Sequence, residues 1–123
     1  MAKVDTLPEI YRPMMGKPSI RWTCCAICGR TYPLNKHHIV RRSAGKMFDE
    51  DGREIEKPTI TLCGFGNNLQ GADGREYCHG LAHHNRLHFR WNEDRDWWEY
   101  LITEEPVKYY KALEMEGWRM LWF

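Results

Sequence analysis

The chain lacks the features that mark membrane, secreted and repeat proteins. None of its apolar runs approaches the roughly 20 residues that a membrane-spanning helix needs, and residues 1–5 contain no apolar signal region. There is also no internal repeat and no low-complexity tract. A length of 123 residues suits one small domain. We expect a cytoplasmic monomer that has no membrane partner.

Net charge is also nearly absent, but the charges are unevenly distributed. The formal charge is +1, yet residues 1–48 carry nine Lys and Arg against two acidic residues, whereas residues 49–123 carry nine against fifteen. The first part can therefore face a polyanion. Basic residues flank the pair His37-His38, and the candidates for nucleic-acid contact among them are Lys36, Arg41 and Arg42. A solvated surface is the alternative interpretation of these charges.

Five cysteines cannot all form pairs, and cytoplasmic thiols stay reduced, so we expect metal ligands rather than disulfides. Cys25-x-x-Cys28-Gly29 is typical of half a zinc knuckle, because its turn points both sulfurs the same way. Cys63 and Cys78 complete four thiolates, and the long loop between them adds only about 1–2 kcal/mol of closure free energy. Cys24 is a spare. A redox role for Cys25 and Cys28 is the alternative, although no βαβ pattern surrounds them.

All six histidines lie between positions 37 and 88. A short helix is predicted from Cys78 to Arg86, and it places His79 and His83 on one face with their rings able to meet one ion. His37 and His38 are adjacent, so on an extended strand they point to opposite sides. One of them can then bind a metal while the other acts as a base. For any single histidine, a surface or buried structural role is the alternative.

The remaining segments give a coarse outline of the fold. We expect short strands at residues 20–23, 59–62 and 87–91, and an exposed hairpin or loop at residues 45–57. The aromatic tail begins at Trp97. In it Thr103 can cap a helix with Glu104, Glu105 and Pro106 in its first turn, and with Tyr110 and Leu113 on its buried side.

Together these motifs resemble those of the HNH endonucleases, in particular the small zinc-containing members carried by bacteriophages. The resemblance covers residues 22–91 and rests on the order and spacing of four motifs, which are Cys25-x-x-Cys28-Gly29, His37-His38-Ile39-Val40, Leu62-Cys63 and Cys78-His79-x-x-x-His83. The aromatic tail is also similar to the tails of phage members.

The resemblance implies an α+β domain with a zinc-stapled ββα-metal (His-Me finger) core. It implies that His38 is the general base, and that His37, His79 and His83 bind a catalytic divalent ion such as Mg²⁺, Mn²⁺, Ni²⁺ or Zn²⁺ beside a structural Zn²⁺. Residues 20–91 are then the nuclease core with its zinc knuckle, residues 1–19 an N-terminal arm, and residues 92–123 a helical extension packed on the core.

Two residues depart from the family pattern. Many relatives have aspartate where this chain has His37, which suggests a more nitrogen-rich metal site here. The middle asparagine of the family normally precedes the Leu-Cys segment, where this chain has Pro58-Thr59-Ile60-Thr61. The asparagines nearby, Asn67 and Asn68, follow Cys63, and Asn68 can support catalysis only if the long insertion folds back.

We therefore expect a metal-dependent DNA endonuclease that nicks or cuts both strands and leaves a 3′-hydroxyl and a 5′-phosphate. By analogy with phage members, it would act in the host cytoplasm during DNA packaging, beside terminase and portal proteins. The alternative is a non-catalytic, zinc-stapled nucleic-acid-binding or adaptor module, which needs the cysteines but no general base.

Overall fold

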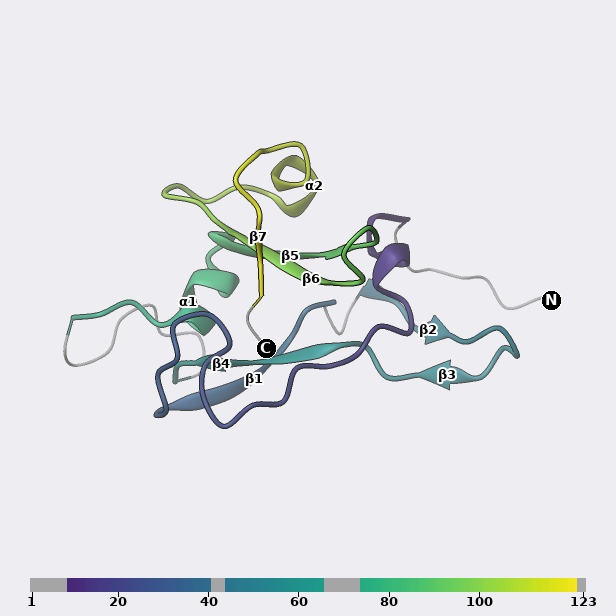
Figure 1. Cartoon of the computed structure of the whole chain (residues 1–123), viewed down its shortest axis with the longest axis horizontal. Coiled ribbons are helices and arrows are strands. Elements are labelled where there is room, and N and C mark those ends of the chain that lie inside the picture. The colour runs from purple at the N-terminus through teal and green to yellow at the C-terminus, as the bar shows by residue number, and fades with distance from the viewer. Residues whose placement is uncertain (1–8, 41–43, 66–73, 122–123) are drawn as a thin grey trace.

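The described part of the chain consists of short strands, two short α-helices and one 3-10 helix (Figure 1). The computed structural model describes residues 9–40, 44–65 and 74–121. In chain order the elements are η1 (Glu9–Met14), β1 (Leu34–His38), β2 (Met47–Phe48), β3 (Glu54–Ile55), β4 (Thr59–Cys63), α1 (Cys78–His83), β5 (Leu87–Asn92), β6 (Trp97–Ile102), α2 (Tyr109–Ala112) and β7 (Arg119–Met120). The described residues thus form a small mixed α/β fold, and none of their helices has the length and apolarity to cross a membrane.

The antiparallel pair β1–β4 lies along one side of the molecule (Figure 1). Its register places Leu34 opposite Cys63 and His38 opposite Thr59. The strand expected at residues 59–62 is confirmed, and it is buried because the segment around Ile20 covers its other edge. Ile20 donates to the Thr59 carbonyl at 2.7 Å and accepts from the Thr61 amide at 2.9 Å. Residues 20–23 themselves form only a single parallel bridge to β4 rather than the expected strand.

The β2–β3 hairpin extends away from the rest of the molecule (Figure 1), as expected for residues 45–57. Its turn is closed by Asp49, whose Oδ1 accepts hydrogen bonds from the amides of Asp51 and Arg53, each at 2.9 Å. Gly52 has a φ of +82°, which a glycine adopts without steric cost. The hairpin is therefore built from local turn chemistry.

A second sheet has the order β5–β6–β7, and α1 lies between it and the β1–β4 pair (Figure 1). The strand expected at residues 87–91 is confirmed as β5. Trp98 on β6 is fully buried, and its indole nitrogen donates to the Pro18 carbonyl at 2.8 Å. Met14 of η1 is also buried in the core. In η1 of the expected N-terminal arm, Tyr11 and Met14 are therefore buried, whereas the other four residues are exposed.

The prediction of a helix that begins after Thr103 is wrong, because α2 covers only Tyr109–Ala112. The Thr103 hydroxyl donates to the Glu105 carbonyl at 2.7 Å instead of capping a helix. The amides of Thr103 and Val107 instead donate to the carbonyls of Arg86 and Asn85, respectively, both at 2.8 Å. These bonds tie the segment to the turn between α1 and β5, and α2 begins only at Tyr109.

The buried face of this tail also differs from the expectation. Tyr110 is 51% exposed, whereas Tyr109 stacks on Tyr11 with ring centroids 5.3 Å apart. The tail therefore consists mainly of β6 and β7, with one helical turn between them.

Candidate metal centres

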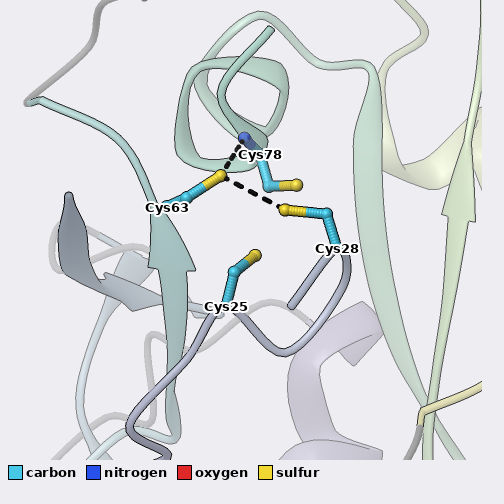
Figure 2. A group of neighbouring side chains, drawn as sticks. All are labelled: Cys25, Cys28, Cys63 and Cys78. Carbon is cyan, nitrogen blue, oxygen red and sulfur yellow. Dashed lines mark hydrogen bonds between the residues drawn. The ribbon is translucent and has the colours of Figure 1, made fainter. Parts of the chain in front are cut away.

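Four cysteine side chains converge at the start of α1. Figure 2 shows the sulfurs of Cys25, Cys28, Cys63 and Cys78 directed toward a common space, and all four sulfurs lie within 4.8 Å of one another. Cys63 ends β4, Cys78 begins α1, and the other two come from one tight turn. That turn is closed by the Gly29 amide, which donates to the Cys25 carbonyl at 2.9 Å. The sequence-predicted thiolate set is thus brought together.

The spacing of the thiols suits tetrahedral zinc. Zn–S bonds of about 2.3 Å in a tetrahedron hold sulfurs about 3.8 Å apart, and the sulfurs of Cys28 and Cys63 are 3.6 Å apart. The amide of Cys78 donates to the Cys63 sulfur at 3.3 Å, which orients that sulfur. Cys24 is half-buried and lies outside the group, as expected of the spare cysteine.

The thiols of this cluster do not all ionise easily without a cation. Hydrogen bonds from the thiols of Cys63 and Cys78 hold the pKa of Cys25 far below its usual range. Interaction with Cys25 raises the pKa of Cys63 to about 11, and interactions with Cys25 and Cys63, together with burial, raise that of Cys78 further. One thiolate thus keeps its neighbours protonated. A divalent cation supplies the positive charge that four thiolates need.

Three histidines form a second group beside the cysteines. His79 and His83 lie one turn apart on α1 with their Nε2 atoms 3.1 Å apart, and His37 of β1 faces them. The His37 ring centroid lies 5.2 Å from that of His79 and 5.6 Å from that of His83. One nitrogen of each ring lies within 4.8 Å of the others, so the three can hold a metal ion.

The electrostatics of this group favour neutral imidazole ligands. Burial, followed by the charges of His79, His83 and His38, lowers the pKa of His37 to about 3. A neutral ring keeps the lone pair that binds a metal. His79 is buried, His37 is half-buried and His83 is exposed, so the group opens to solvent on the side of His83. Such an open side leaves room for a non-protein ligand.

His38 lies outside the three-histidine group. It lines a small pocket of about 70 Å³ together with His37 and His88. It also lines a larger cleft of about 470 Å³ together with Lys36, in agreement with the alternation of side chains along a strand. His38 thus lines both the small pocket that it shares with His37 and the larger cleft next to the β2–β3 hairpin.

Both clusters draw ligands from α1 and from the β1–β4 pair. Cys63 and His37 lie on the paired strands β4 and β1, and Cys78 immediately precedes His79 on α1. Where β4 ends, Gly64 lets α1 approach closely, since a Cβ at this position would lie only 2.9 Å from the His79 Cβ. The contacts that hold the cysteines together therefore also place His79 and His83 opposite β1.

Asn35 is a residue of this site that sequence reasoning missed. Its Nδ2 donates to the Gly64 carbonyl, which ties β1 to the end of β4. The available signal was its position two residues before His37, which places both on the same side of a strand. Asn67 and Asn68, considered for a supporting role, lie outside the described residues, as do Arg41 and Arg42.

Comparisons do not assign this chain to a known group. No protein-family model, no curated protein and no solved structure matches it. What it can do therefore follows from the two clusters and the surface around them.

Proposed function

We propose that this protein is a metal-dependent DNA endonuclease of the HNH type. The observation that carries the proposal is the placement of His38 directly beside His37 in β1, while His37 joins His79 and His83 in a group able to hold a metal ion. The order of elements supports it, since the antiparallel pair β1–β4 is followed by α1, as a ββα-metal core requires.

In this proposal three histidines bind the divalent ion and a fourth acts as the general base. When bound at His37, His79 and His83, a divalent ion supplies Lewis-acid stabilisation of the charge that develops on the scissile phosphate. His38 accepts a proton from the attacking water, a contribution typically worth about 10²- to 10⁴-fold in rate. The products are a 3′-hydroxyl and a 5′-phosphate. Of the three ion ligands, His37 lines a small pocket together with His38, so the base and the ion site adjoin at this pocket.

The cysteine cluster takes a structural role. Cys63 and Cys78 join the end of β4 to the start of α1, so zinc at this cluster fixes the helix relative to the strand pair. With four protein ligands the site is closed, whereas the histidine group has three. The chain thus combines one closed site for structure and one open site for chemistry.

A non-catalytic nucleic-acid-binding module is the second candidate, and the basic cleft beside His38 favours it. Such a module needs the cysteine cluster and the cleft, but it has no use for three converging histidines with an open side. Strand cleavage therefore decides between the two candidates. A role in phage DNA packaging stays a prediction in either case.

The test is plasmid cleavage. Zinc-loaded protein is incubated with supercoiled plasmid and Mg²⁺, Mn²⁺ or Ni²⁺, and nicked and linear products are followed on a gel. We expect nicking that EDTA abolishes and that falls at least about 100-fold in His38→Ala. His83→Ala should lower the affinity for Mn²⁺, whereas His38→Ala should retain Mn²⁺ binding and the fold.

The matched control is His84→Ala. His84 is exposed, lies next to His83 at the end of α1 and stands outside the three-histidine group. It should bind Mn²⁺ and cut DNA like the wild type. DNA binding without cleavage under all three metals would establish the binding module instead, and loss of Mn²⁺ binding in His38→Ala but not in His37→Ala would reverse the roles of the pair.

A further inference from the structure

A cleft lined mainly by charged side chains lies between the β1–β4 pair and the β2–β3 hairpin. Its volume is about 470 Å³, and His38 lies at its wall. Four basic residues from four separate segments of the chain line it, namely Arg21, Lys36, Lys46 and Lys57. Two acidic residues, Glu54 and Glu56, also line it, so basic residues outnumber acidic ones two to one.

The ion pairs within the cleft are weak. Arg21 pairs with Glu56 at 3.5 Å, and Lys46 pairs with Glu54 at 3.6 Å. All four side chains are more than half exposed, and exposed pairs of this kind add little to stability. Arg21 and Lys46 can therefore exchange their partners for a more strongly charged anion without a large loss.

The floor of the cleft contains a buried hydroxyl. Thr59 lines the cleft and is only 6% exposed. Its Oγ1 has no hydrogen-bond partner among the described residues. This oxygen is closed off from solvent, so Thr59 contributes other atoms to the wall of the cleft and offers no hydrogen bond to a ligand there. Thr59 lies directly opposite His38 in the strand pair.

We propose that this cleft binds backbone phosphate groups of DNA. Arg21, Lys36, Lys46 and Lys57 neutralise the phosphate charge along the cleft. Because Thr59 is paired with His38, the bound strand passes beside the general base. The assignment of that strand as a substrate rests on the proposed nuclease function, whereas binding of the strand does not.

Binding is measured by fluorescence anisotropy with a labelled short DNA duplex. The protein carries its structural zinc, no exchangeable divalent ion is added, and the salt concentration is varied. The association constant falls as salt rises, and removing one phosphate contact should make the slope of its logarithm against log salt concentration less steep by about 1. At about 0.15 M salt this change weakens binding about fivefold. We expect this result for Lys46→Gln and for Lys57→Gln. Lys111→Gln is the matched control, because Lys111 is exposed on α2 and outside the cleft.

The outcomes also separate this inference from the proposed function. If Lys46→Gln and Lys57→Gln bind the duplex as tightly as Lys111→Gln does, the cleft is not the binding site, even if the wild type cuts plasmid. If these variants lose affinity but no metal supports cleavage, the cleft assignment holds and the nuclease proposal fails. Displacement of the duplex by an equal concentration of inorganic phosphate would reveal a small-anion site and would overturn the inference.

Discussion

Gly64→Ala tests whether the close approach of α1 to β4 positions the histidine group. Gly64 follows β4, and its amide donates to the Pro33 carbonyl at 3.1 Å. Its backbone φ is +154°, and an added Cβ would lie 2.9 Å from the Cβ of His79. The His79 Cβ is fixed to the helix backbone, so a rotation of the His79 side chain cannot relieve this contact.

The size of the effect follows from that distance. Favourable carbon contacts occur at about 3.5–4.0 Å, so the helix must move by roughly 0.5 Å or more at His79. Overpacking of this kind costs about 1–3 kcal/mol. At about 4 °C per kcal/mol for a chain of this size, the melting temperature should fall by about 4–12 °C beyond the effect of backbone strain.

Gly52→Ala controls for backbone strain. Gly52 also has a positive φ, of +82°, but no atom lies within 4 Å of a Cβ built there. Both substitutions strain the backbone, and only Gly64→Ala also collides with the helix that carries His79. The comparison of the two variants therefore isolates the effect of the displaced helix.

The assays are thermal unfolding of the zinc-loaded protein and calorimetric titration with Mn²⁺. Gly64→Ala should bind Mn²⁺ about 10- to 100-fold more weakly, as is typical when a supporting contact of a metal ligand is lost, whereas Gly52→Ala should bind it normally. Equal melting temperatures and equal Mn²⁺ affinities for the two variants would refute the reasoning that Gly64 positions His79.

Three further results are expected. Cys28→Ser should lose the single tightly bound zinc and unfold, whereas Cys24→Ser should keep both zinc and fold, and native mass spectrometry with circular dichroism checks this. Asn35→Ala should lower the free energy of unfolding by about 1–2 kcal/mol and weaken Mn²⁺ binding, since its hydrogen bond to Gly64 is lost. Asn35→Asp cannot donate that bond, so denaturant titrations should show a similar loss in the free energy of unfolding. Without an ion at the histidines, the free energy of unfolding should fall as pH drops from 6.5 toward about 3, because the unfolded chain takes up a proton that folded His37 excludes. His37→Gln should fall less steeply over the same window, and an identical slope would contradict the role of His37.

The sequence by itself determined the features that depend on short-range geometry. A Cys-x-x-Cys-Gly turn points two sulfurs the same way whatever surrounds it, and residues four apart on a helix share a face. The knuckle at Cys25 and Cys28 and the pair His79 and His83 were therefore predictable. The same holds for the β2–β3 hairpin, whose turn residues act on their own backbone.

Part of the histidine site was also predictable from alternation. Adjacent residues on a strand point to opposite sides, so His37 and His38 had to separate. The sequence could not decide by geometry alone which of them faces α1. That depends on how β1 packs, and the structure places His37 against His79 and His83.

The tertiary structure decided whatever depends on residues far apart in the chain. Thr103 would cap a helix in isolation, but the amides of Thr103 and Val107 bond to the carbonyls of Arg86 and Asn85. These bonds tie the segment to the turn between α1 and β5. Asn35 finds its partner in Gly64, twenty-nine positions later. Local propensities are worth only about 1 kcal/mol or less per residue, so packing and long-range hydrogen bonds override them.

The basic cleft is likewise a product of the tertiary structure. Arg21, Lys46 and Lys57 are scattered in the sequence, and nothing in their spacing predicts that they share a surface with His38 and Thr59. Their proximity arises because Lys46 and Lys57 flank the base of the β2–β3 hairpin, which adjoins β1 and β4 at His38 and Thr59. Composition and local pattern thus fixed which chemical groups the chain carries, and the long-range strand pairing decided which of those groups face one another, because only chain reversal brings distant side chains within contact distance.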